Sequence, residues 1–329
     1  MSILPQTMWV NLPVLIVSFY VLARGANLLV DGSVGIAFKL QIPKVIIGIV
    51  LVSFATTMPE FTVSLISAIQ KHSEIALGNA VGSVIVNVSA ALALGVIFAP
   101  KALKLDPSVY WSIGIVFFAS AILAFVLALN GTIGRIEGAG LLLALIAYLV
   151  YLLVTEKKRK NRELEREAVE DVETHKSEGR LVKFLSVFAL GLLIVIVASR
   201  LLVESAIHIA ETLGLSETII GLTVIAIGTS LPEVATSVVA TRKGHGDLAF
   251  GDIMGANILN ILWIVGGASV ARPIQVSQRE ILFMFPSMLG VVGIMYLLSW
   301  FGYTLNRWKS ICLVLLYIGY SVVTFVFFI

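Results

Sequence analysis

Two blocks of this 329-residue sequence align without a gap when the chain is shifted by 173 residues. "IIGIVLVSFATTMPEFTVS" from Ile46 matches "IIGLTVIAIGTSLPEVATS" from Ile219, and "GNAVGSVIVN" from Gly78 matches "GDIMGANILN" from Gly251. From residue 46 to residue 87, 13 of 42 positions are identical at this offset. Shared apolar composition does not account for aligned Pro, Glu, Gly and Asn residues, so the chain contains an internal repeat.

Composition places this repeat in a membrane. Hydrophobic residues make up 58% of the chain and charged residues 13%, whereas about a quarter of a typical soluble protein is charged. The single cysteine, Cys312, excludes a disulfide framework and a CxxC metal site. A net charge of +3 is too small to indicate nucleic-acid binding. We therefore expect an integral membrane protein in contact with lipid.

Ten stretches are long and apolar enough to cross a bilayer as helices. They lie near residues 9–26, 43–69, 75–99, 109–129, 136–154, 183–205, 218–241, 248–270, 279–299 and 308–328. The sequence thus predicts an all-α membrane protein with two five-helix units, 1–154 and 182–329, joined by a charged loop, 155–181. An offset of 173 residues spans five helices, an odd number, so the second unit enters the membrane in the opposite sense. Inverted repeats of this kind are typical of transporters.

The charged loop sets the orientation. Residues 155–180, "TEKKRKNRELEREAVEDVETHKSEGR", cannot lie in lipid, and we expect a solvated, partly helical tether; a regulatory role is the alternative. With the N-terminus outside, 18 of the 23 Lys and Arg residues fall on the side of this loop. The positive-inside rule then puts the loop in the cytoplasm and both termini outside the cell membrane. The first apolar stretch lacks a basic flank, so we expect a retained helix.

Two of the predicted spans carry a proline followed directly by a glutamate, Pro59–Glu60 and Pro232–Glu233. A charge near mid-bilayer costs at least ~2.5–3.5 kcal/mol on insertion scales. Proline also breaks the helix and leaves the carbonyl four residues earlier without its helical donor. Because the exposed backbone oxygens lie where the glutamate needs co-ligands, the pattern indicates a cation site.

The other polar residues of these spans supply oxygen. They recur at helical spacing beside the glutamates and on the partner spans: Ser53, Thr56, Thr57, Ser64, Ser67, Thr223, Thr229, Ser230, Ser237, Asn79, Ser83, Asn87, Asp252, Asn257 and Asn260. No cluster of His or Cys accompanies them. Oxygen-only ligation suits Ca²⁺ and Na⁺ and argues against zinc or copper.

The electrostatic repulsion between the two glutamates gives a physical reason for ion exchange. Two carboxylates about 4 Å apart repel by ~4 kcal/mol at an effective dielectric near 20. An empty, doubly ionised site is therefore unfavourable. One Ca²⁺, two Na⁺ or two protons would each neutralise it, and mutually exclusive occupancy is the physical basis of antiport.

Several of these residues also have a structural interpretation. Most transmembrane Ser and Thr hydroxyls bond to their own helix. Asn79 and Asp252 lie two turns from Asn87 and Asn260, where they could cap helices or line an access path. The glycines of the second block, such as Gly82 and Gly255, would let helices approach closely.

At these residues the sequence resembles the sodium/calcium exchangers of the cation/calcium antiporter superfamily, the prokaryotic members included. "GTSLPE" from Gly228 fits the family pattern, "ATTMPE" from Ala55 is a close variant, and the resemblance covers the whole chain. It implies ten helices in two inverted repeats, four ion sites in a diamond of oxygens, and a first and sixth helix that slide across the other eight.

Carried over by position, the resemblance implies a set of cation ligands. They are Glu60, Glu233, Ser53, Thr56, Thr57, Ala226, Thr229, Ser230, Ser83, Asn87 and Asn260, with helix breaks at Pro59 and Pro232; roles for Asn79, Asn257 and Asp252 stay open. Many sodium/calcium exchangers have an acid where this chain has Asn260 and a serine where it has Ala256. This departure puts the family's exchange of three Na⁺ for one Ca²⁺ in doubt. Asp252 lies too far along its helix to replace the missing ligand directly.

Our main hypothesis is a secondary antiporter, monomeric and without cofactor, that exchanges Ca²⁺ for Na⁺. The alternative within transport is exchange of Ca²⁺ or another cation for protons through the same two glutamates. A membrane protein that only binds cations is a hypothesis from another class, and the inverted repeat argues against it. An enzyme is not expected, because no HExxH motif and no phosphate-binding glycine loop are present.

Overall fold

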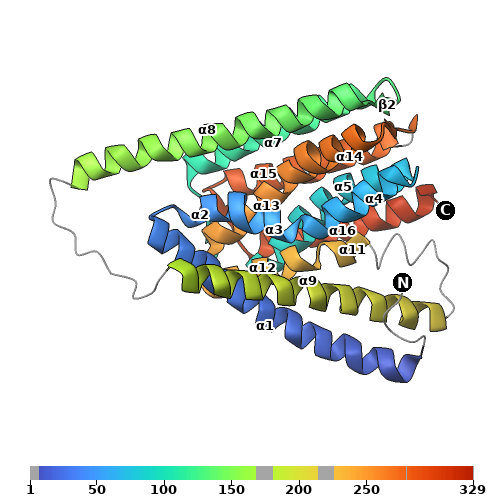
Figure 1. Ribbon diagram of the computed structural model, residues 1–329, viewed down its shortest axis with the longest axis horizontal. Helices are drawn as coiled ribbons and strands as arrows, with labels where there is room; N and C mark the ends of the chain where they lie inside the picture. The colour runs from blue at the N-terminus through green and yellow to red at the C-terminus, as the bar shows by residue number, and fades with distance from the viewer. Residues whose placement is uncertain (1–6, 168–180, 214–225, 279, 329) are drawn as a thin grey trace.

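The computed structural model describes residues 7–167, 181–213, 226–278 and 280–328, which are mostly helical (Figure 1). The helices, with π-helical segments marked η, are α1 Met8–Leu40, α2 Lys44–Ile47, η1 Gly48–Val52, α3 Ser53–Thr56, α4 Met58–Ile69, α5 Ser73–Val86, η2 Asn87–Leu92, α6 Ala93–Phe98, α7 Pro107–Ala128, α8 Arg135–Glu167, α9 Leu181–Thr212, α11 Ala226–Thr229, α12 Leu231–Arg242, α13 Gly246–Leu259, η4 Asn260–Val265, α14 Gly266–Ala271, η5 Glu280–Met284, α15 Phe285–Trp300 and α16 Arg307–Phe328. Segments that follow one another directly, such as α13, η4 and α14, continue one helix.

The apolar helices confirm a multi-pass membrane protein. Among the described residues, seven helices are long and apolar enough to cross a bilayer. An eighth span results if the bent pair Lys44–Thr56 and Met58–Ile69 crosses once. Residues 218–225 of the predicted seventh span lie outside the described residues, so the count of ten helices stays a prediction.

Three helices are longer than the apolar stretches predicted. We expected spans at 9–26 and 183–205, but α1 and α9 continue to Leu40 and Thr212. Likewise α8 does not end at residue 154 but runs to Glu167, since no Gly or Pro interrupts residues 155–167. An apolar run marks only the part of a helix that would cross the lipid. The helix itself continues into water until a helix-breaking residue ends it. For α1 that breaker is Gln41 in the left-handed conformation, with φ 54°, followed by Pro43.

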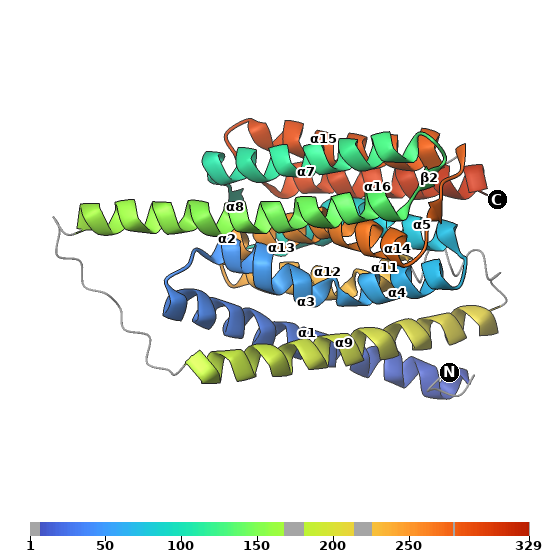
Figure 2. The same ribbon diagram turned by 45° about the horizontal axis from the view of Figure 1, so that its top comes forward.

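The helices form a bundle with one pair set along its side. In both views α1 and α9 lie side by side along one face, while α7, α8 and α15 lie on the opposite face (Figures 1 and 2). The centre is occupied by α13 and its continuation. Of the apolar stretch of Gly246–Ala271, 94% is buried inside the molecule, against 33% for Met8–Leu40. The span that contains α13 is therefore surrounded by protein, whereas most of the apolar stretch of α1 lies on the surface of the bundle.

Glycines allow α1 and α9 to pack closely. A Cβ on Gly191 of α9 would lie 2.3 Å from the Leu29 backbone nitrogen, and one on Gly32 of α1 would lie 2.6 Å from that of Phe188. Such contacts need glycine, as in other membrane helix pairs. At the centre, Gly255 similarly lets α13 approach the Ile49 backbone. In the first half the corresponding glycine is Gly82, and the segment that the repeat would place against it lies outside the described residues.

Short strand pairs join the loops, which the all-α prediction did not foresee. β1 Leu103–Lys104 pairs with β4 Thr304–Leu305, and β2 Thr132–Ile133 pairs with β3 Ile274–Gln275, both antiparallel. Each pair connects a loop of the first half of the chain with a loop of the second half. Two residues of pairing carry no period-2 pattern in the sequence, so only the tertiary arrangement reveals them.

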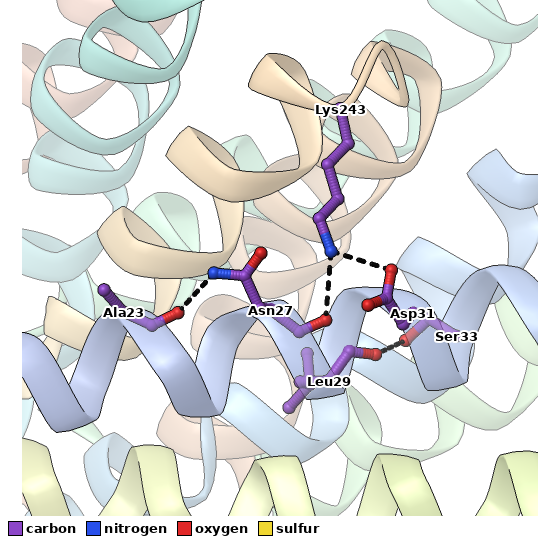
Figure 3. A network of polar contacts seen from close by, with 6 residues as sticks. All are labelled: Ala23, Asn27, Leu29, Asp31, Ser33 and Lys243. Carbon is purple, nitrogen blue, oxygen red and sulfur yellow. Dashed lines mark hydrogen bonds and ion pairs between the residues drawn. The ribbon is translucent and has the colours of Figure 1, made fainter.

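An ion pair ties α1 to the turn after α12. The Lys243 Nζ lies 2.7 Å from Asp31 Oδ1 and 3.5 Å from the Asn27 carbonyl oxygen (Figure 3). Within α1, Asn27 donates to the Ala23 carbonyl and Ser33 to the Leu29 carbonyl. Because the Asp31 side chain is 58% exposed, such a pair contributes only about 0–1 kcal/mol.

Replacing Gly191 tests the close packing of α1 on α9. In Gly191→Ala the new methyl group meets backbone atoms that cannot turn away, so we expect a loss of about 1–3 kcal/mol and a lower melting temperature in detergent. Gly290→Ala is the matched control, because the described residues place no atom within 4 Å of its Cβ. Equal melting temperatures for the two variants would contradict this packing.

Candidate functional site

Glu60 lies in the first turn of a helix that starts at a break in the second span. α3 ends at Thr56, α4 begins at Met58, and the two helical pieces meet at an angle of 46°. Pro59 occupies the first turn of α4, where a backbone N–H would have no helical acceptor, so the proline costs no hydrogen bond there. The predicted kink is therefore confirmed, and it places a carboxylate at the positive end of a helix.

Glu233 has the same setting in the second half of the chain. α11 ends at Thr229, α12 begins at Leu231, and Pro232 lies in the first turn of α12. The Glu233 side chain is 0% exposed and that of Glu60 is 1% exposed. Both glutamates are thus inside the protein at the start of a helix.

Two hydrogen bonds cross between the halves and bring the glutamates into one site. The Thr57 hydroxyl donates to Glu233 Oε1 at 3.5 Å, and the Ser230 hydroxyl donates to Glu60 Oε1 at 3.4 Å. Both donors and both acceptors are related by the same 173-residue offset, so the two bonds are equivalent. The structure therefore gathers four of the predicted ligands, one hydroxyl and one carboxylate from each half.

Several buried polar atoms of the residues singled out in the sequence have no hydrogen-bond partner among the described residues. They are Glu60 Oε2, Glu233 Oε2, Asn87 Oδ1, Ser237 Oγ and both amide atoms of Asn260. A buried acceptor without a partner is unfavourable, by about 1–3 kcal/mol and more when it is charged. A cation bound by these oxygens would remove that cost, so the donor set fits Ca²⁺ or Na⁺.

The asparagines lie where the helices become π-helical. η2 starts at Asn87 and η4 at Asn260, again 173 residues apart. Asn87 Nδ2 donates to Asn257 Oδ1 at 3.2 Å, which joins α13 to the end of α5. π-helical segments commonly mark functional sites, because the extra residue changes the direction of side chains. The sequence showed the repeated Asn but not this local widening.

The remaining predicted ligands are buried nearby or lie at the helix break. Ser83 is 2% exposed, one turn before Asn87 on α5. Ser53 donates to the Ile49 carbonyl of its own helix, as most membrane serines do, and keeps its lone pairs. Ala226 lies on α11, and because its side chain is a methyl group, only its backbone could contribute.

A second layer of hydrogen bonds involves the residues whose roles stayed open. Thr56 donates to Asp252 at 3.3 Å, and its counterpart Thr229 donates to Asn79 at 3.3 Å. Asp252 also accepts from Thr236 at 2.8 Å. Thr236 was not among the residues predicted from the sequence, although its repeat partner is Val63 and this departure from the repeat was a usable signal.

The chain matches known proteins over most of its length. The family model described as "Sodium/calcium exchanger protein" matches residues 10–154 and 183–326. The sodium/calcium exchanger MaX1 of Methanosarcina acetivorans is 28% identical over 96% of this chain and 99% of its own length. The inner membrane protein YrbG of Escherichia coli is 31% identical over 87% of each chain.

A solved structure has the same fold. The sodium-calcium exchanger NCX_Mj, in a structure soaked with Na⁺ and Ca²⁺, superposes with a TM-score of 0.76 and 26% identity. The match covers 94% of this chain and 96% of that one. The fold resemblance predicted from sequence is thereby confirmed.

Neutralising either buried carboxylate tests whether it holds a cation. Glu60→Gln or Glu233→Gln keeps the side-chain shape and removes one charge. We expect Ca²⁺ binding, measured by isothermal titration calorimetry in detergent, to weaken at least about a hundredfold, or ~2.7 kcal/mol.

Lys158→Ala is the control, because Lys158 belongs to the charged C-terminal part of α8, beyond the apolar stretch that ends near residue 154. This variant should bind Ca²⁺ as the native chain does. Native affinity in both glutamine variants would show that the carboxylates do not bind the ion.

Proposed function

Because the chain belongs to the sodium/calcium exchanger family, we propose that it exchanges Ca²⁺ for Na⁺ across the cell membrane by alternating access. The family is one of transporters, so the chain is not an enzyme. One observation carries the proposal: two buried carboxylates from opposite halves each accept a hydroxyl of the other half, and each keeps one oxygen without a hydrogen-bond partner among the described residues. That pocket needs positive charge from outside the protein.

The proposed architecture consists of ten helices in two inverted five-helix repeats, 1–154 and 182–329. Support comes from features that recur at or near the same offset. The π-helices η2 and η4 are 173 residues apart, and so are the two bonds that join the glutamates to the other half. The strand pairs also correspond, because β1 with β4 repeats as β3 with β2 to within two residues.

In this proposal the ligands are the oxygens already predicted. Glu60 and Glu233 supply the charge, and the neutral ligands are Ser53, Thr56, Thr57, Ala226, Thr229, Ser230, Ser83, Asn87 and Asn260. Ca²⁺ takes six to eight oxygens and Na⁺ fewer, so the same set serves either ion in turn. Since the two compete for one pair of carboxylates, bound Na⁺ displaces Ca²⁺, which is the coupling that exchange requires.

We further propose that the chain functions as a monomer with both termini outside. The orientation is supported by the charge distribution, because most Lys and Arg residues fall on the side of residues 155–181. In this orientation the end of α8 and the start of α9 lie in the cytoplasm. The exposed surfaces of α1 and α9 then face lipid along their length.

Ion flux in proteoliposomes tests the function. Vesicles that contain the purified chain are loaded with Na⁺ and diluted into Na⁺-free buffer with tracer Ca²⁺. We expect Ca²⁺ uptake that requires the outward Na⁺ gradient and stops when the gradient is removed with an ionophore.

A second arm replaces the Na⁺ gradient with a proton gradient of the same size. Uptake that follows the proton gradient and ignores Na⁺ would overturn Na⁺ coupling and establish proton exchange through the same glutamates. Ca²⁺ binding without any counterflow would instead mean that the chain is not a carrier. Vesicles with the Glu233→Gln variant serve as the blank.

A further inference from the structure

We propose that Asp252 provides a third negative charge for the cation site and acts through Thr56 instead of binding the ion itself. This inference rests on the proposed function, since it concerns the charge that the same pocket presents to its cations. It makes Asp252 a positioning residue that determines how tightly the pocket holds a divalent ion.

The first observation is that Asp252 is buried and has no cationic partner among the described residues. It lies on α13, its side chain is 1% exposed, and none of the ion pairs among the described residues includes it. Its two carboxylate oxygens accept from two hydroxyls, Thr56 at 3.3 Å and Thr236 at 2.8 Å. A carboxylate held in this way requires positive charge nearby, and the transported cation is the available source.

The second observation is how near Asp252 comes to the proposed ligands. A Ca²⁺ ion on the Thr56 hydroxyl, at an ordinary distance of about 2.4 Å, would lie at most about 6 Å from Asp252 Oδ1. Thr56 can instead donate to the Val52 carbonyl at 3.2 Å, but an ionised carboxylate is the stronger acceptor. When Thr56 donates its single proton to Asp252, both lone pairs of its oxygen are left for the cation.

The third observation is that the hydrogen bonds alone do not require an acid here. The counterpart of Asp252 is Asn79, which accepts from Thr229 at 3.3 Å and uses its amide N–H to donate to the Glu60 carbonyl at 3.0 Å. A carboxylate cannot donate. In the second half the Thr236 hydroxyl lies 3.2 Å from the Glu233 carbonyl oxygen and 2.8 Å from Asp252 Oδ2, and its single proton can go to only one of them at a time.

The two halves therefore differ by a charge, although polar groups lie within hydrogen-bonding distance of the glutamate carbonyl in both. In the first half Asn79 fills all these bonds with a neutral side chain. In the second half the chain uses Asp252 and one added hydroxyl for the same purpose. On the site-facing side of α13, Ala256 and Asn260 follow at four-residue steps and are neutral, so Asp252 is the acid of that face. Together with Glu60 and Glu233, Asp252 makes three buried carboxylates at or beside the site.

The test is Asp252→Asn in the full chain, reconstituted in proteoliposomes. Asparagine can accept from one of the two threonine hydroxyls with its oxygen and donate to the other with its amide N–H, so the fold and the melting temperature should be unchanged. We expect the half-saturating Ca²⁺ concentration for Na⁺-driven exchange to rise about tenfold or more, while the maximal rate changes by less than about threefold.

The matched control is Asp247→Asn, which removes an exposed acid from the first turn of the same helix. It should leave the half-saturating Ca²⁺ concentration within about twofold of native, because exposed charges are screened. A decisive variant combines Asp252→Asn with Asn260→Asp. If charge is what Asp252 supplies, this variant should recover Ca²⁺ affinity to within about threefold of native.

Two results would overturn the inference. The first is Asp252→Asn with native Ca²⁺ dependence. The second is a loss of affinity that comes with a lower melting temperature and that Asn260→Asp does not restore, which would assign Asp252 to packing. Failure of the proposed function looks different, because the native chain itself would then show no Na⁺-driven Ca²⁺ exchange.

Discussion

The structure depends on a charge that its own side chains do not balance. Glu60 and Glu233 lie in a protein interior within a membrane, and each accepts one hydroxyl bond from the opposite half. Among the described residues no Lys, Arg or His pairs with either of them. Neutral hydroxyls cannot compensate two negative charges at low dielectric, so an inorganic cation or a proton must. Exchange follows when two kinds of cation compete for that position.

The irregular backbone around the site serves the same need. A continuous α-helix uses its carbonyls internally and leaves them no capacity for an ion. The breaks before Met58 and Leu231, and the π-helical segments that start at Asn87 and Asn260, all lie at the polar residues of the site. Irregular backbone is tolerated at membrane depth where it is enclosed by protein, as it is here.

Much of the site could be predicted because a repeat exposes what apolar composition hides. Pro-Glu pairs and aligned asparagines stand out against aliphatic residues. Because they recur at one offset, they predicted that residues from both halves form a single site. The partners were harder to predict: that Thr57 bonds to Glu233 and Ser230 to Glu60 is a tertiary fact. Thr236 was missed because its role appears only when its contacts with Glu233 and Asp252 are compared with the contacts of Asn79 in the first half. The ends of α1 and α9 were missed because hydropathy reports lipid contact and not helix length.

The most direct measurement of the central claim is a crystal structure of the native chain soaked in Ca²⁺ or Na⁺ salts. We expect ordered ion density between Glu60 and Glu233, with the second carboxylate oxygen of each residue turned toward it. At high Na⁺ concentration, Ca²⁺ should be excluded from this position. Saturating soaks that leave the space between these carboxylates without an ion, while both side chains keep the positions described, would contradict it.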